Sequence, residues 1–202
     1  MTNWPDVPRV CFGKDGPGHL ITNVDWVRQS TEIATRAYVE GYRRAAEALF
    51  AHTTTVQRMS PEYMLWPLAF LWRHHVELAL KDIIATGRQI KNGDEGRSFP
   101  RIHRLRELWD TAKPHIVMYG DPNAPELANV AGNIDEFESV DESSTSFRYA
   151  PEGVGGLRKL PGTVNLTALH EAMVAISNFL DAVHECQQRE IEALQSAADY
   201  RS

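Results

Sequence analysis

The sequence contains few cysteines and no long hydrophobic run. Its two cysteines, Cys11 and Cys186, lie far apart in the chain, which argues against a disulfide framework and against a thiolate metal site. No segment approaches the uninterrupted apolar length of a membrane span, and residues 1–16 hold no apolar run of signal-peptide length. We therefore expect a cytoplasmic protein with no membrane partner.

The chain also lacks a basic excess and the motifs of several enzyme classes. A net charge of −6 argues against a protein that binds nucleic acid over its whole surface, although cations gather between Arg88 and Arg106. There is no G-x-S-x-G elbow, no Walker A loop and no dinucleotide fingerprint. The Glu-x-x-His pairs of ferritin-like bundles are missing as well. We expect no metal and no cofactor.

What the sequence has is helical periodicity. With 202 residues, of which 43% are hydrophobic, the chain is large enough to bury the core of one domain. Apolar residues recur at spacings of three and four in several segments, which predicts an all-α, up-and-down bundle of four to five helices. We expect an irregular arm over 1–22, a single domain over 23–198 and a long loop over 143–165. The predicted helices cover 24–51, 61–86, a segment from 102 onward that Pro114 breaks or kinks, 125–142 and 165–198.

Two of these helices have features that predict how they pack. The first carries a stripe of small residues that would let it lie close along the second: Ala34, Ala37, Gly41, Ala45 and Ala48. The last would span about 50 Å, more than a small bundle needs. Its C-terminal half is therefore expected to protrude or to pack on another subunit.

The second helix carries ionisable residues within a densely apolar sequence. Arg73, Glu77 and Lys81 follow each other at intervals of four residues, and His74 lies three residues before Glu77, so the four share one stripe. Such a stripe is either a salt-bridge ladder facing solvent or the wall of a functional cleft. The sequence leaves both interpretations open.

The order of these motifs resembles that of the HEPN superfamily of α-helical bundles, in a branch that contains an Arg-Tyr-Pro element. The resemblance rests on RHHVELALKDII, then RIHRLRELWD, then an acidic helix leading into SFRYAP, and then a long final helix. The matching residues are Glu77, Lys81, His103, Arg148, Tyr149 and, one position late, Pro151. The resemblance implies a homodimer formed through helices and a role around RNA or nucleotides in bacterial stress, toxin–antitoxin or phage-defence systems.

Two functions follow from this resemblance. In the first, the chain is a metal-independent endoribonuclease that acts as a dimer, with His103 as general acid or base and Arg97 or Arg148 as phosphate clamp. The Arg-x(4–6)-His spacing of such nucleases occurs between Arg97 and His103. The residues expected to orient or bind the substrate are Arg73, His74, Glu77, Lys81 and Tyr149.

In the second, the chain is a non-catalytic module that binds a nucleotide or a protein partner, such as a nucleotidyltransferase-type protein. The acidic net charge favours this function, as do Gly153, Val154 and Gly155 at the positions where a nuclease histidine would follow Arg148. His103 would then be structural, capping its helix or bonding to Glu77. In either case we expect one crevice formed by His74, Glu77, Lys81, His103 and Arg148.

Overall fold

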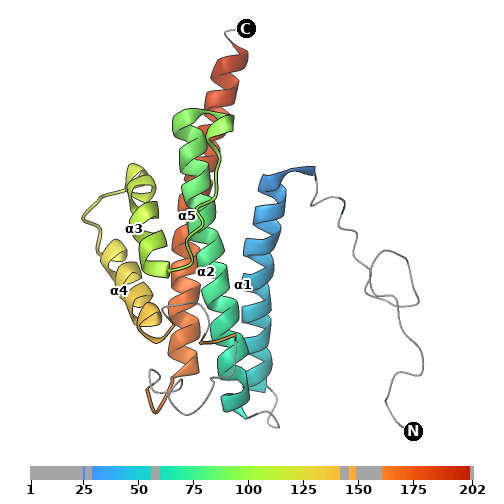
Figure 1. Ribbon diagram of the computed structural model, residues 1–202, viewed down its shortest axis with the longest axis vertical. Helices are drawn as coiled ribbons and strands as arrows, with labels where there is room; N and C mark the ends of the chain where they lie inside the picture. Colours follow the sequence, from blue (N-terminus) through green and yellow to red (C-terminus); the bar gives the residue numbers. More distant parts are fainter. Residues whose placement is uncertain (1–24, 26–28, 56–59, 142–145, 149–160, 201–202) are drawn as a thin grey trace.

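The computed structural model describes residues 25, 29–55, 60–141, 146–148 and 161–200 (Figure 1). In these ranges the chain forms an all-α helical bundle without strands, as predicted. None of the described helices is long and apolar enough to cross a membrane. The helices are α1 (Thr31–Thr55), α2 (Pro61–Asn92), α3 (Leu105–Ile116), α4 (Pro125–Val140) and α5 (Leu166–Asp199), with the short 3-10 helices η2 (Asp94–Gly96) and η3 (Val117–Tyr119).

Helix α2 is the central element of the bundle. It runs beside α1, with α5 behind it and α3 and α4 on the other side (Figure 1). Ser60 occupies the N-cap position and Pro61 begins the helix, as the sequence predicts. Because neighbours cover α2 on most sides, its middle is half-exposed only along one narrow line. We call this line the open strip; it consists of Phe70, Leu71, His74, Leu78 and Lys81.

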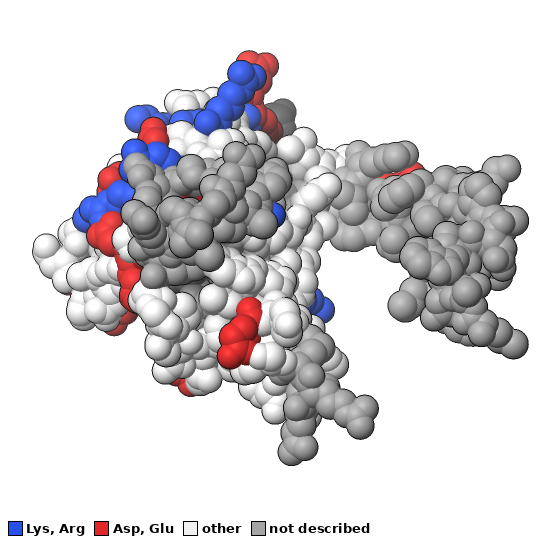
Figure 2. Space-filling view, turned by 60° about the horizontal axis from the view of Figure 1, so that its bottom comes forward, with Lys and Arg blue, Asp and Glu red and all other residues white. Residues whose placement is uncertain are grey.

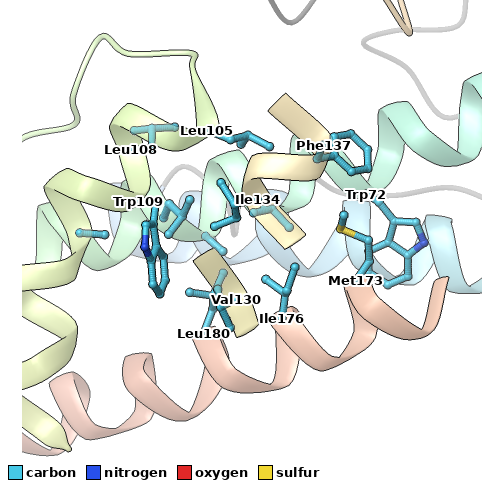
Figure 3. Close-up of a cluster of buried hydrophobic side chains, with 14 of the residues drawn as sticks. Trp72, Leu105, Leu108, Trp109, Val130, Ile134, Phe137, Met173, Ile176 and Leu180 are labelled. Carbon is cyan, nitrogen blue, oxygen red and sulfur yellow. The ribbon is translucent and has the colours of Figure 1, made fainter. Parts of the chain in front are cut away.

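The core lies between α2 and the three helices that follow it. Figure 3 shows Trp109 from α3, Ile134 from α4 and Leu180 from α5 in one cluster of buried side chains. Each of these three side chains is at most 1% exposed. Fully burying a large apolar side chain contributes about 1.5–3 kcal/mol, so this cluster holds the helices against α2.

The small-residue stripe of α1 does not face α2, contrary to the prediction. The two helices do lie side by side (Figure 1), but Gly41, Ala45 and Ala48 are exposed. The buried residues of α1 are instead Val39 and Ala46. Larger side chains on that face, including Leu49 and Phe50, pack against the core and bury more apolar area than the small stripe would.

Helix α2 does not end at Gly87, where the sequence predicted a loop. It continues to Asn92 and stops at Gly93, whose φ of 79° suits glycine. At Gly87 an added Cβ would meet Nδ1 of His115 at 2.2 Å. Gly87 therefore allows α3 to approach α2 closely and does not terminate the helix.

Helix α3 begins three residues later than predicted. Residues 101–104 precede the helix, with Arg104 at its N-cap, so His103 lies before the helix and does not open it. Glu138 of α4 accepts a hydrogen bond from the backbone N–H of Leu105 at 2.9 Å and caps the helix from outside. Pro114 lies inside α3 and does not break the helix, which ends two residues later at Ile116; the alternative prediction of a kink stays a prediction.

Helix α5 follows the prediction at both ends. Asn165 is the N-cap, and its side chain accepts a hydrogen bond from Ala168 N at 3.1 Å. The residues after Ile191 are exposed, and Figure 1 shows this end extending past the bundle. The predicted arm over 1–22 and most of the predicted loop over 143–165 lie outside the described residues.

Candidate functional site

The Arg73, Glu77 and Lys81 stripe of α2 is a buried ion-pair network. Arg73 Nη1 donates to Glu77 Oε2 at 2.8 Å, and Lys81 Nζ donates to Glu77 Oε1 at 2.9 Å. The side chains of Arg73 and Glu77 are 2% exposed, and that of Lys81 is 12% exposed. The three residues therefore form the predicted salt-bridge ladder, but the ladder is buried and does not face solvent.

Glu77 remains ionised in this setting. Burial raises the pKa of its carboxyl group, but hydrogen bonds from Lys81 and His103 outweigh that effect. The charge of Lys81 and the hydrogen bond from Arg73 act in the same direction. The net pKa of Glu77 is lowered from its ordinary 4.5, so the group is a carboxylate near neutral pH.

His103 joins this network from the segment before α3. Its Nδ1 lies 2.9 Å from Oε1 of Glu77, while 65% of its side chain is exposed. Its backbone carbonyl accepts a hydrogen bond from Arg73 Nη2 at 2.7 Å, which fixes the segment. Because a carboxylate only accepts, Nδ1 must carry the proton, and the neutral ring then presents the lone pair of Nε2. This is the tautomer that a general base on the surface requires.

Arg148 lies over the other end of the open strip. Its guanidinium carbon is 5.3 Å from the centroid of the Phe70 ring, within cation–π range. Phe70 precedes Glu77 by seven residues, about 10 Å along the helix. His74 lies between these two levels of α2. Arg148 and His103 thus lie on either side of His74 along the strip.

His74 is held by aromatic contacts in the middle of the strip. Its ring lies 4.3 Å from that of Tyr42, edge to face, and stacks on Phe70 at 5.6 Å. Burial lowers the pKa of His74 below its ordinary 6.5; Glu77 opposes this shift, and the charge of Arg148 reinforces it. The ring is therefore neutral at pH 7, and it shares the Phe70 ring as a neighbour with Arg148.

Asp141 is a member of the network that the sequence analysis missed. Its Oδ2 forms an ion pair with Arg73 Nε at 2.9 Å, and its side chain is 1% exposed. Oδ1 accepts a hydrogen bond from the backbone N–H of Ser146 at 2.8 Å. Two positive and two negative side chains, Arg73, Lys81, Glu77 and Asp141, thus balance within the cluster. The sequence offered a weak signal, an acidic residue at the C-terminal end of the predicted acidic helix.

Arg97 belongs to a second buried cluster and shares no partner with His103. It donates to Asp82 Oδ1 at 2.7 Å and to Thr86 Oγ1 at 2.8 Å. Asp82 in turn lies 3.3 Å from Nδ1 of His184 on α5. The contacts of Arg97 hold the segment after α2 against α2 itself. The five-residue interval between Arg97 and His103 therefore does not bring the two side chains onto one site.

Several other cations of the sequence run 88–106 are also paired within the protein. Arg104 Nε lies 3.0 Å from Glu138, and Arg106 pairs with Asp135. In Figure 2, which turns the lower end of the bundle forward, acidic and basic side chains are interspersed along one side, and most of the described surface is uncharged. These arginines are therefore neutralised within the protein.

The five predicted crevice residues fall into two groups of direct contacts on α2. Glu77 hydrogen-bonds to Lys81 and His103, while His74 and Arg148 both lie against the ring of Phe70. Tyr149 lies outside the described residues. Within the described ranges, no three histidine, cysteine or acidic residues are grouped to hold a metal.

Comparisons with known proteins add no relative to this description. No family model matches the chain, and searches of curated proteins and of solved structures likewise found no match.

Proposed function

We propose that this chain is a HEPN-like, RNA-targeting effector of bacterial stress or phage defence that cleaves RNA as a cytoplasmic homodimer without a metal. The observation that supports it most is the hydrogen bond between the exposed ring of His103 and the buried carboxylate of Glu77. A buried carboxylate that fixes the tautomer of an exposed imidazole is the arrangement by which histidine acts as a general base in hydrolytic sites.

In this proposal, Nε2 of His103 removes the proton from a ribose 2′-hydroxyl, and the 2′-oxygen attacks the adjacent phosphorus. The bond from phosphorus to the 5′-oxygen breaks and leaves a 2′,3′-cyclic phosphate. The departing 5′-oxygen takes a proton from a second acid, which a second copy of the chain would supply. Arg148, which lies over Phe70 two turns of α2 from Glu77, binds a neighbouring phosphate of the same strand by charge.

A second candidate function is a module that binds a nucleotide or a protein partner without catalysis. The pairing of Arg97, Arg104 and Arg106 with carboxylates favours it, because cations already neutralised within the fold contribute little to binding RNA phosphates. In that case His103 and Glu77 would stabilise the segment before α3. Arg148 would then supply the charge that holds a nucleotide.

The two functions are separated by incubating purified protein with mixed RNA in EDTA. We expect the wild type to cleave, and His103→Ala to cleave at least about 100-fold more slowly, the usual contribution of a general base. His52→Ala is the matched control, since His52 is also exposed but lies at the end of α1. Intact RNA with wild-type protein, or equal rates for wild type and His103→Ala, would exclude the nuclease. Calorimetric binding of ATP by the wild type, weakened in Arg148→Gln, would then support the binding module.

A further inference from the structure

One buried side chain, Arg73, joins three parts of the chain at the candidate site. Through Nη1 it holds Glu77 on its own helix, and through Nη2 it holds the backbone carbonyl of His103. Through Nε it forms an ion pair with Asp141, the residue at which α4 ends. The guanidinium is planar and rigid, so these three contacts fix the relative positions of the three parts.

Asp141 passes this connection on to the segment that carries Arg148. While Oδ2 faces Arg73, Oδ1 accepts the backbone N–H of Ser146, two residues before Arg148. Phe147 anchors the same segment in the core, with its ring 5.4 Å from that of Phe137. The packing of Phe147 in the core and the hydrogen bond from Ser146 to Asp141 therefore both hold this segment in place.

From these contacts we infer that Asp141 and Arg73 are positioning residues, which hold Arg148 and His103 at opposite ends of the open strip by one continuous buried chain of contacts. The chain runs from the His103 carbonyl to Arg73, to Asp141, to the Ser146 N–H and so to Arg148. Neither Asp141 nor Arg73 touches a substrate in this account. The importance of this chain of contacts for catalysis rests on the proposed function, whereas the coupling between its two ends is a property of the fold.

The chemistry of Asp141 makes this coupling specific to a carboxylate. An asparagine keeps the shape, but only one of its two atoms can accept. If the asparagine oxygen accepts the Ser146 N–H, the amide NH₂ group faces Arg73. If the amide group is flipped, the NH₂ group faces the Ser146 N–H. Asp141→Asn therefore breaks one contact of the chain in either orientation.

The test measures the titration of His74 by NMR, because its pKa responds to Arg148. In the wild-type background, Arg148→Gln is expected to raise the pKa of His74 by about half a unit, the effect of removing one charge several Å away in a water-like dielectric. In the Asp141→Asn background, the same substitution is expected to have almost no effect, since Arg148 has already left its place over Phe70. Asp181→Asn is the control background, because Asp181 pairs with Arg43 between α1 and α5.

Ser146→Pro is a second background that keeps the test decisive if Asp141→Asn does not fold. It removes the N–H donor without changing either residue of the Arg73–Asp141 pair, and it should also abolish the effect of Arg148→Gln. An unchanged effect in both backgrounds would overturn the inference, as would its loss in the Asp181→Asn control. No RNA is needed, so a failure to cleave RNA would refute the proposed function and leave this result to stand on its own.

Discussion

The burial of Glu77 leads to a strong prediction for the variant Glu77→Gln. The substitution keeps the size of the side chain but removes a charge that is 2% exposed and contacts Arg73, Lys81 and His103. Arg73 and Lys81 would then be balanced by Asp141 alone, leaving one buried positive charge without a counter-ion. Removing one partner of a buried ion pair typically destabilises by 3–5 kcal/mol, so we expect the free energy of unfolding to fall by about that amount.

For a chain of this size, such a loss corresponds to a fall in Tm of about 10 °C, measured by thermal denaturation at pH 7. Asp135→Asn is the control, because it removes a carboxylate that also pairs with an arginine but is 53% exposed. We expect it to change the stability by at most about 1 kcal/mol. If Glu77→Gln melted within a degree of the wild type, the buried network would not be an important source of stability.

Two further predictions concern helix packing and acid stability. Gly87→Ala should destabilise the protein by about 1–3 kcal/mol in urea unfolding, because the added Cβ would overlap His115. Gly41→Ala, whose Cβ meets nothing within 4 Å, should stabilise the protein by up to about 1 kcal/mol. Equal effects of the two substitutions would contradict the close approach of α2 and α3. Burial lowers the pKa of His75 below 6.5, so on acidification the unfolded chain takes up a proton at a higher pH than the native protein does. The contribution of His75 to stability is therefore complete above pH 6.5. It is lost as the pH falls from there towards the lower native pKa. In His75→Asn the amide can still donate to the Val39 carbonyl. The unfolding free energy of this variant should fall less steeply between pH 7 and 5, by at most about 1.4 kcal/mol per pH unit. An unchanged slope would contradict the lowered pKa of His75.

The sequence predicted all five helices because their apolar periodicity reflects burial directly. It placed the ends of α2 and α3 wrongly where tertiary contacts decide them. A glycine such as Gly87 commonly ends a helix, but here it leaves the space that the ring of His115 occupies against α2. The start of α3 depends on Glu138, a cap from another helix that no local pattern reveals.

The candidate site was predictable only in part, for a related reason. Glu77 and Lys81 lie four residues apart on one helix, so their contact follows from helix geometry alone. The contact of Arg73 with Asp141 joins residues far apart in the sequence and depends on how α4 packs. Arg97 was assigned to the His103 site by spacing, but the turn after α2 brings it back to Asp82 instead.

In the proposed site, Glu77 keeps the proton of the His103 ring on Nδ1 and leaves Nε2 free to act as a base. The ¹⁵N NMR shifts of this ring at pH 8, in wild type and in Glu77→Gln, report which nitrogen carries the proton. We expect a protonated Nδ1 and an unprotonated Nε2 in the wild type, with this preference lost in the variant. A wild-type ring protonated on Nε2, or a ring that averages both tautomers in the two proteins alike, would contradict it.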